Sequence, residues 1–264
     1  METFLEKIFK TKKLRVDAQK RLVDTVELRE RARQKRYASV RNTFEKALQN
    51  SNKTNIIAEI KRASPSKGII NNKIDVASLA AGYERGGACS ISVLTEEDFF
   101  KGSLDDIRAV REAVDIPILR KDFVFDEFQI YEAADVGADA VLLIVAMLDD
   151  KDLENLYRLA YAELGLDVLV EVHTIEELER AKHLDAKIIG VNNRDLHSFK
   201  VSLDVSRELI KYTRNETLMI SESGLQSRDE ILELQELGFR GFLIGETLMK
   251  SGDAERSLIE MVTG

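Results

Sequence analysis

Two opposite charges, Glu59 and Lys61, lie at the end of an apolar run that has the composition of a buried β-strand. The run begins at Ile56, and a turn rich in serine, proline and glycine follows Lys61. Residues two apart in a strand share one face, so the two charges are expected side by side. A strand that is apolar on both faces is normally buried, and buried charge is costly unless it is paired or used. The pair therefore suggests an active site.

Other polar residues follow the later apolar runs in the same way. They are Lys121 with Asp122 and Phe123, Glu171, Asn192 with Arg194, Glu222 with Ser223 and Gly224, and Gly245. Lysine and glutamate side chains that meet in one place can act as general acid and general base. Glycines at the last two strand ends would let backbone N–H groups and a helix N-terminus approach an anion, a pattern typical of phosphate sites.

The elements that would position these residues alternate regularly along the chain. Short β-rich runs, spaced roughly 25 to 30 residues apart, are separated by amphipathic helical patterns, which indicates repeated βα units. Eight parallel strands close a barrel, so we predict the α/β class and a (β/α)8 TIM barrel whose strand ends meet at one mouth. An open doubly wound sheet is the alternative. The expected strands are Ile56–Lys61, Ala88–Leu94, Ile116–Lys121, Ala140–Val145, Asp167–Val172, Lys187–Asn192, Leu218–Glu222 and Phe242–Gly245.

Local signals mark where several helices begin and end. Amphipathic patterns predict helices over Asp152–Leu164 and Asp229–Leu237. Two pairs have the spacing of a capping box, in which each partner satisfies a backbone N–H of the other. They are Ser227 with Glu230 and Thr174 with Glu177. Glycine commonly stops a helix, and the candidates are Gly87, Gly137, Gly165 and Gly238.

The first 50 residues do not follow the βα rhythm. They are expected to form an N-terminal helical extension packed on the barrel of residues 51–264, with one structural domain overall. The basic segment Arg29–Arg41 could be a nucleic-acid patch, because arginines cluster there with Tyr37. Acidic residues at Glu27 and Glu30 favour instead a solvated helix face that caps one end of the barrel.

Composition narrows the class of protein further. With 264 residues, of which 44% are hydrophobic, the chain can build one large core. A formal charge of -8 argues against a general nucleic-acid binder, and a single cysteine, Cys89, excludes an intramolecular disulfide framework or a cysteine zinc site. No apolar stretch approaches the ~20 residues of a membrane span. Dinucleotide, P-loop and zinc-protease motifs are absent, and the three histidines share no ligand spacing and look incidental.

Each candidate residue also has a purely structural interpretation. Lys121 could be solvated at a turn, and Glu171 could only favour the N-terminus of a following helix. Glu59 and Lys61 could form a structural ion pair. The convergence of two lysines, three glutamates, an asparagine and an arginine on one predicted mouth favours the functional interpretation.

Seven ordered segments of this sequence resemble the indole-3-glycerol phosphate synthase family of tryptophan biosynthesis. The resemblance covers most of the chain, from Asn42 to Met249, and the first segment is long and highly specific. The segments are Ile57-Ala58-Glu59-Ile60-Lys61-Arg62-Ala63-Ser64-Pro65-Ser66, Ser92-Val93-Leu94-Thr95-Glu96, Leu119-Arg120-Lys121-Asp122-Phe123, Leu169-Val170-Glu171-Val172, Ile189-Gly190-Val191-Asn192-Asn193-Arg194-Asp195-Leu196, Ser221-Glu222-Ser223-Gly224 and Leu243-Ile244-Gly245.

The resemblance implies a reaction and its catalytic residues. The reaction is ring closure of 1-(2-carboxyphenylamino)-1-deoxyribulose 5-phosphate to indole-3-glycerol phosphate, with loss of carbon dioxide and water. Lys121 matches the family's general acid, and Glu171, Lys61 and Glu59 match positions that serve the dehydration. A cationic acid near the ketone oxygen would stabilise and protonate the developing oxyanion.

The other matching positions are implied to bind substrate. Lys61, Ser64 and the backbone near the last two strand ends would hold the phosphate, with Glu246 using its amide because its carboxylate must point away. An arginine fork suits the anthranilate carboxylate, and apolar side chains suit the anthranilate ring. The positions are Asn192, Arg194, Glu222, Ser223, Gly224, Gly245, Glu246, Ser64, Phe100, Phe123 and Leu196.

The resemblance also sets expectations about cofactors and partners. We expect no cofactor and no metal, a small phosphorylated substrate, no nucleic acid, no membrane, and a cytoplasmic location. The chain is expected to be a monomer, and association with other tryptophan-pathway enzymes is left open.

Three other functions remain as alternatives. Another barrel enzyme of phosphorylated sugars, such as phosphoribosylanthranilate isomerase, should show cysteine or aspartate catalysts near the first strand, whereas Glu59 and Lys61 stand there. A Schiff-base aldolase would need a desolvated lysine, for which Lys121 qualifies. A phosphosugar-binding module would bind the substrate without turning it over.

Overall fold

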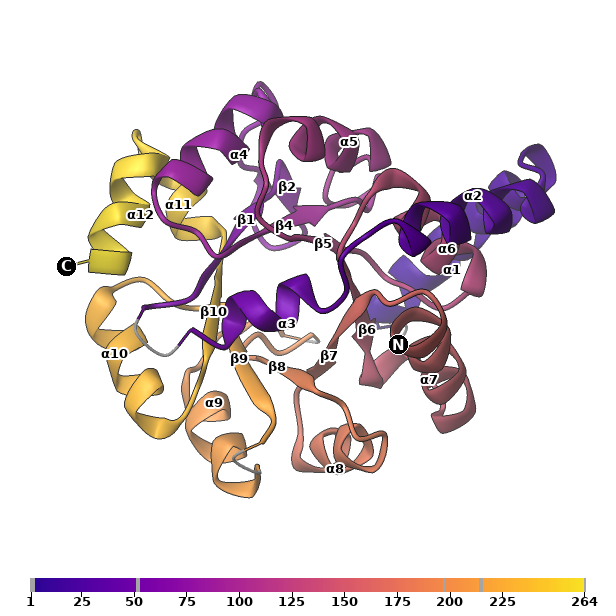
Figure 1. The fold of residues 1–264 in the computed structure, drawn as a ribbon. Helices are drawn as coiled ribbons and strands as arrows, with labels where there is room; N and C mark the ends of the chain where they lie inside the picture. The colour runs from indigo at the N-terminus through magenta and orange to yellow at the C-terminus, as the bar shows by residue number, and fades with distance from the viewer. Residues whose placement is uncertain (1–2, 51–52, 197, 214–215, 264) are drawn as a thin grey trace.

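The fold is a closed barrel of eight parallel strands surrounded by helices (Figure 1), as predicted. The structure is a computed structural model and describes residues 3–50, 53–196, 198–213 and 216–263. Around the barrel the strand order is β1, β10, β9, β8, β7, β6, β5, β4, and β4 pairs again with β1. The strands are β1 Ile56–Ile60, β4 Ser90–Leu94, β5 Ile118–Lys121, β6 Ala140–Ile144, β7 Asp167–Val172, β8 Ile188–Asn192, β9 Leu218–Glu222 and β10 Gly241–Ile244.

Helices follow the strands around the outside, as βα units require. A short antiparallel hairpin, β2 Ala63–Ser64 with β3 Gly68–Ile69, stands after β1. The helices of the barrel are α4 Val76–Arg85, α5 Leu104–Ala113, α6 Glu127–Val136, α7 Asp150–Tyr157, α8 Ile175–His183, α9 Asp204–Leu209, α10 Arg228–Leu237, α11 Glu246–Lys250 and α12 Ala254–Thr263. Short helical segments are η1 Val145–Met147, η2 Arg158–Glu163 and η3 Ile210–Tyr212.

Small departures from the predicted bounds have local causes. β5 begins at Ile118 rather than Ile116, because Pro117 has no N–H to give to the ladder. α7 begins two residues before the predicted Asp152, because the Asp149 side chain caps the helix by accepting a hydrogen bond from the Asp152 amide at 2.8 Å. That helix then continues as a π-helical turn over η2 instead of an α-helix to Leu164.

The predicted helix signals are confirmed with one exception. Ser227 and Glu230 form a reciprocal capping box at α10. Gly137 and Gly238 end α6 and α10 with φ values of 93° and 117°, in the left-handed region that favours glycine. Thr174 caps α8, but the Glu177 carboxylate turns to the backbone and ring of His173, so this box is not reciprocal.

The interior of the barrel holds its own apolar cluster, distinct from the larger one between strands and helices. Its members include Ile57, Leu169 and Leu243. Helix α3 (Thr43–Leu48) crosses one end of the barrel (Figure 1) and places Phe44 and Leu48 in this cluster. The α3 helix therefore closes the N-terminal end and leaves the opposite end for function.

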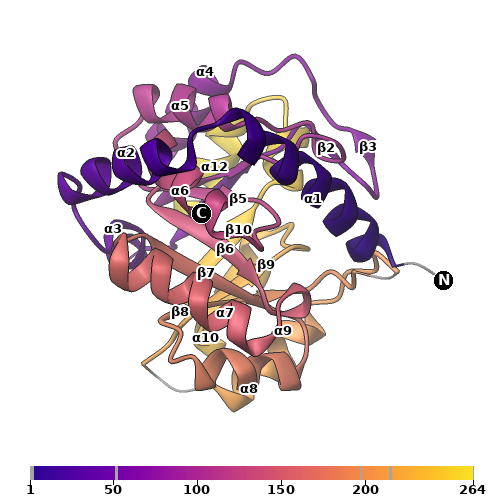
Figure 2. The same ribbon diagram turned by 90° about the vertical axis from the view of Figure 1, so that its right-hand side faces the viewer.

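Helix α2 (Thr25–Tyr37) lies elsewhere than the predicted cap. It packs along the side of the barrel on α6 (Figure 2), where Arg31 contacts Asp135 at 3.1 Å. The buried Arg36 donates hydrogen bonds to the Leu164 and Gly165 carbonyls at 3.2 and 2.6 Å. End-capping by the segment Arg29–Arg41 is thus wrong, because these arginines find their partners on the side of the barrel. Among the described helices, none combines the length and apolar character that crossing a membrane requires.

Candidate active site

A cavity of about 990 Å³ opens at the C-terminal end of the barrel. Helix α1 (Phe4–Leu22) lies over part of it and contributes Phe4, Leu5 and Ile8, which the sequence alone did not indicate. The structure also brings every predicted site residue to the wall of this one cavity. These residues are Glu59, Lys61, Ser64, Phe100, Lys121, Phe123, Glu171, Asn192, Arg194, Leu196, Glu222, Ser223, Gly224, Gly245 and Glu246.

Three charged side chains, Lys121, Glu171 and Glu222, form what we call the inner cluster. Lys121 ends β5, and its Nζ lies 3.3 Å from Oε2 of Glu171 on β7 and 3.3 Å from Oε2 of Glu222 on β9. Asn192 at the end of β8 donates a hydrogen bond of 3.2 Å to Oε1 of Glu171. Both carboxylates are buried, whereas the lysine side chain is 14% exposed. One ammonium group thus serves two buried carboxylates.

The two carboxyl groups of the inner cluster titrate in opposite directions because they share one cation. Burial favours the neutral form of both. For Glu171, the charges of Lys121 and His173 and the Asn192 hydrogen bond outweigh burial and lower its pKa. For Glu222, burial together with the charge of Glu171 outweighs Lys121 and raises the pKa to about 7. Burial opposes the charge of Lys121 too, but the carboxylates outweigh it, so its pKa is raised and the lysine stays cationic.

Glu59 and Lys61 lie in the wall of the same cavity as the inner cluster. The Nζ of Lys61 contacts Oε1 of Glu59 at 2.5 Å, as expected from their period-2 spacing. Gly245 lies directly against Glu59, and a Cβ built on Gly245 would overlap that carboxylate. A glycine is therefore required there for the close approach, although its backbone is not left-handed. The buried Ser64 of the hairpin strand β2 lines the same cavity.

The predicted phosphate end has an unusual backbone and several cations. Ser223 and Gly224 both have positive φ, 67° and 90°, so two successive residues after β9 are left-handed. The Glu246 carboxylate lies 2.6 Å from the Nζ of Lys250 and 3.5 Å from Nη2 of Arg194. Lys67, 3.8 Å from the same carboxylate, completes the group. The Arg194 guanidinium thus has a carboxylate partner within the cavity wall.

An aromatic wall in the same cavity is formed by the loops after β4 and β5. The rings of Phe100 and Phe123 are 6.0 Å apart between centroids. Glu96 fixes the loop after β4, because its Oε2 accepts hydrogen bonds from the amides of Phe99 and Phe100 at 2.7 and 3.0 Å. Leu196 is a further apolar residue of the lining.

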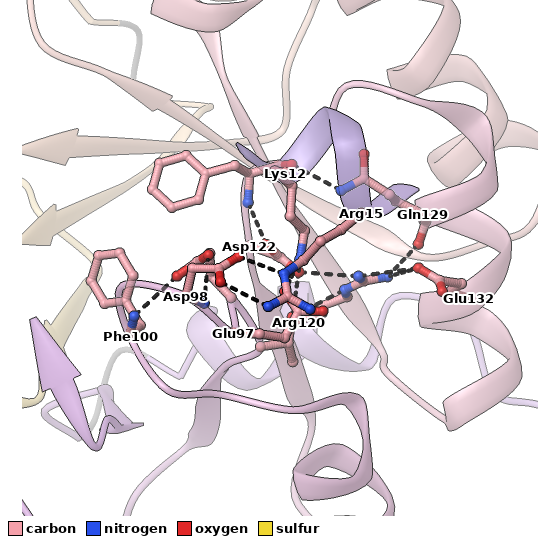
Figure 3. Close-up of polar contacts among 12 residues, drawn as sticks. Lys12, Arg15, Glu97, Asp98, Phe100, Arg120, Asp122, Gln129 and Glu132 are labelled. Carbon is pink, nitrogen blue, oxygen red and sulfur yellow. Dashed lines mark hydrogen bonds and ion pairs between the residues drawn. The ribbon is translucent and has the colours of Figure 1, made fainter. Parts of the chain in front are cut away.

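A second set of charges lies on the other face of β5, and Figure 3 shows Lys12, Arg120, Asp122 and Glu132 of this set. We call these four residues and Thr95 the outer cluster, and all of them are buried except Glu132, whose side chain is 11% exposed. Lys12 of α1 contacts Asp122 at 2.8 Å. Arg120 donates to Asp122 at 3.1 Å and to Glu132 of α6 at 3.3 Å. The cluster ties the N-terminal helix to the strand that carries Lys121.

Sequence reasoning dismissed one histidine that belongs to this region. His173 follows β7, and its Nε2 lies 3.4 Å from Oε1 of Glu171. The signal was available, because residues 171 and 173 are two apart and share a face of the strand. His183 is exposed at the end of α8, and His197 lies outside the described residues. In the part of the chain that the structure describes, no three His, Cys, Asp or Glu side chains are grouped to hold a metal ion.

Solved structures of low identity share the fold. The chain superimposes on 3-hexulose-6-phosphate synthase from Salmonella typhimurium with a TM-score of 0.64 and 14% identity, over 79% of this chain and 96% of that one. For thiamine phosphate pyrophosphorylase from Pyrococcus furiosus the TM-score is 0.59 and the identity 17%, over 79% and 93% of the two chains. At this identity the likeness shows the barrel fold alone.

Sequence relatives are much closer. A family model described as indole-3-glycerol phosphate synthase matches residues 5–261. The indole-3-glycerol phosphate synthase of Carboxydothermus hydrogenoformans is 42% identical over 97% of this chain and 98% of its own length. Those of Aquifex aeolicus and Exiguobacterium sibiricum are 51% and 52% identical over 83% and 79% of this chain, and over 85% and 80% of their own lengths. The chain therefore belongs to the indole-3-glycerol phosphate synthase family.

Proposed function

We propose that this protein is a carboxy-lyase of tryptophan biosynthesis that converts 1-(2-carboxyphenylamino)-1-deoxyribulose 5-phosphate to indole-3-glycerol phosphate. The observation that carries this proposal beyond family membership is the inner cluster. One cationic lysine lies between two carboxyl groups with opposite pKa shifts, and all three line a cavity of about 990 Å³. Groups whose pKa values are pushed apart are suited to acid and base roles.

Lys121 is the proposed general acid. Ring closure joins an aryl carbon to the ketone carbon, and negative charge develops on the ketone oxygen. The raised pKa of Lys121 keeps its ammonium group charged, so it can stabilise that oxygen and then protonate it. Decarboxylation follows, and the benzene ring regains aromaticity.

Dehydration then needs a base and an acid. Glu171 is the proposed base, since its lowered pKa keeps it ionised. Glu222, with a pKa of about 7, can carry a proton near neutral pH. Lys61, paired with Glu59 in the same wall, is the proposed second cation, near the departing hydroxyl and the phosphate.

The substrate would lie across the cavity with its phosphate toward β9 and β10. The left-handed turn at Ser223 and Gly224 and the glycine at Gly245 let the backbone approach an anion. The anthranilate ring would lie against Phe100 and Phe123, with Leu196 on the same wall. Asn192, Arg194, Ser64 and the Glu246 amide are the remaining proposed contacts, and Arg194 would exchange the Glu246 carboxylate for a substrate carboxylate.

A fluorescence assay tests the proposal. The purified protein should turn over the carboxyphenylamino-deoxyribulose phosphate, and product should appear as indole fluorescence. A phosphosugar-binding module would bind this substrate without a fluorescence gain. Covalent trapping of the substrate by borohydride would support Schiff-base chemistry instead, because such a step passes through a lysine imine.

We also infer that the protein acts as a monomer in the cytoplasm. The single cysteine, Cys89, offers no intramolecular disulfide, and burial raises its thiol pKa to about 12. Static light scattering on a sizing column should give the mass of one chain, near 30 kDa. A mixture with other tryptophan-pathway enzymes, run on the same column, would show whether they associate. A concentration-independent mass of two chains would contradict the monomer.

A further inference from the structure

His173 lies directly behind the Glu171 carboxylate, between it and a second carboxylate. The histidine follows β7, and its side chain is 13% exposed. Its Nδ1 lies 3.2 Å from Oε2 of Glu177 on α8, and its Nε2 lies 3.4 Å from Oε1 of Glu171. His173 is not among the described residues that line the cavity. Any effect of this ring on substrate must therefore pass through Glu171.

Glu177 fixes the ring from behind. The same Oε2 atom that contacts Nδ1 accepts a hydrogen bond of 2.7 Å from the His173 amide. An ionised carboxylate can only accept, so Nδ1 carries a hydrogen toward Glu177. This use of Glu177 also explains why the capping box with Thr174 is incomplete. The ring is thereby held with Nε2 aimed at Glu171.

If the His173 ring is neutral and carries its hydrogen on Nδ1, the other ring nitrogen, Nε2, is left without a hydrogen bond to the described residues. Nε2 is buried and, among the described residues, has no hydrogen-bond partner. Without a proton its lone pair would face the Glu171 carboxylate and repel it, whereas with a proton it can donate to Oε1. The protonated ring therefore suits this position.

The charges around the ring agree with that geometry. Burial lowers the pKa of His173, but the hydrogen bond to Glu177 and the charges of Glu171 and Glu177 outweigh burial and raise it. Glu222 on β9 acts in the same direction. Lys121 on β5 is the cation on that side, and it is already paired with Glu171 and Glu222.

We propose that His173, oriented by Glu177, is a positioning residue that holds the Glu171 carboxylate ionised and turned toward Lys121. This inference rests on the proposed function, since the role is defined within that reaction. Oε1 of Glu171 has Asn192 and His173 on one side, which leaves Oε2 to Lys121 and the cavity. Removal of the ring frees the carboxylate to rotate and weakens it as an oriented base.

Two substitutions separate positioning from simple packing. His173→Leu should lower kcat by about 10- to 100-fold, the scale of a misplaced catalytic group, while KM stays within about 2-fold. His173→Gln should recover most of that loss, because its amide nitrogen can donate to Glu171 from the place of Nε2. His183→Leu is the matched control at the exposed end of α8 and should leave both constants unchanged.

The pH dependence gives a readout that a packing role would not move. In the wild type, kcat should fall as the pH rises through the His173 pKa, because the ring loses the charge that holds Glu171. His173→Gln should lack this alkaline limb. Glu177→Gln keeps an acceptor for the His173 amide and Nδ1 but removes the charge, so the limb should move to lower pH. NMR titration of the His173 ring should show the same shift without any substrate.

Several results would contradict the role proposed for His173. Wild-type kcat in His173→Leu, or equal losses in His173→Leu and His173→Gln with matching losses in Tm, would overturn the positioning role. An NMR pKa for His173 no higher than that of His183 would overturn the charged ring. If the wild-type protein itself gives no turnover, the proposed function fails instead, and the NMR titrations still test the ring's charge.

Discussion

The outer and inner clusters share one short stretch of chain, Arg120-Lys121-Asp122, yet they are built differently. Period 2 sends Arg120 and Asp122 to the outside of the barrel and Lys121 to the mouth. Asp122 accepts a hydrogen bond of 2.8 Å from Lys12 (Figure 3). It accepts another of 2.6 Å from Thr95. Burial works against the Asp122 charge, but Lys12 and Arg120 outweigh it and lower the pKa to about 2.

The inner cluster leaves its groups incompletely paired. Both carboxylate oxygens of Glu222 are buried without a hydrogen-bond partner among the described residues, although Lys121 lies 3.3 Å from one of them. In the outer cluster, no buried side-chain nitrogen or oxygen of the described residues lacks such a partner. Fully paired buried charges hold elements together, whereas incompletely paired ones facing a cavity are available to a substrate. In this barrel the structural outer cluster differs from the inner cluster, which is proposed to act in catalysis, in how completely its charges are paired and not in whether they are buried.

Breaking the outer cluster should have the largest effect. Asp122→Asn keeps the shape of the side chain but removes the charge that two buried cations share. Urea unfolding should show a loss of about 3 to 5 kcal/mol, the range for one partner of a buried ion pair. Because we propose that the N-terminal helices and the barrel form one structural domain, a single transition should remain.

A matched control for that experiment is a second ion pair that also involves α1. Asp98 pairs with Arg15 of α1, but its side chain is 29% exposed. Asp98→Asn should therefore cost about 1 kcal/mol or less. Equal losses for the two variants would mean that burial of the outer cluster adds nothing.

Breaking the inner cluster should instead show in catalysis. Lys121→Ala should lower kcat by at least ~100-fold, the scale expected for a general acid. The fluorescence assay measures it, and Lys211→Ala, on an exposed lysine of η3, is the control. Full activity of the Lys121 variant would remove the assignment of this lysine as the acid.

The pH dependence of stability tests the raised pKa of Glu222. The folded-state pKa of Glu222, about 7, lies above the ordinary value of 4.5 because of burial. The folded protein therefore binds the extra proton, and this stabilising contribution is complete below pH 4.5 and disappears as the pH rises to 7. Relative to Glu222→Gln, the wild type should lose stability across that window, by up to about 1.4 kcal/mol per pH unit. Parallel stability curves for the two proteins would show that Glu222 titrates normally.

The smallest effect is expected for a charge pair that is not buried. Arg207 of α9 makes two hydrogen bonds to Glu233 of α10, at 2.6 and 2.9 Å, but both side chains are well exposed. Solvent screens such a pair, so Arg207→Met should change Tm by no more than about 3 °C. A calorimetric shift as large as that of Asp122→Asn would undo the distinction between buried and exposed pairs.

Much of the barrel followed from local signals. All eight strands begin within two residues of the predicted start and end within one residue of the predicted end, and β7 and β9 match at both ends. Alternating apolar runs, glycine stops and Pro117 act through the backbone of a few neighbouring residues, so they can be read without a structure. The gathering of Lys121, Glu171 and Glu222 also followed, because parallel strands in a barrel put their C-terminal ends at one mouth.

The contacts that depend on how helices dock on the barrel could not be predicted from the sequence. Lys12 and Asp122 are separated by 110 positions, and nothing in the basic pattern of α1 indicates which acid it meets. His173 shares a strand face with Glu171, yet its partner Glu177 also fits a capping box, and both uses agree with the same spacing. The Glu246 carboxylate was expected only to turn away from phosphate, whereas it pairs with Arg194, Lys67 and Lys250.

The sequence by itself determined the barrel and the set of polar residues at its mouth, because strand periodicity and parallel connections place them without long-range information. Only the tertiary structure decided which of these charges are fully paired and which are not. The pairing depends on how α1, α6 and α8 dock on the barrel. Each of these helices either brings in a partner from elsewhere in the sequence or orients a partner that is near in the sequence. Pairing is a property of three-dimensional neighbours, and it separates the charges that hold this protein together from those proposed to act on its substrate.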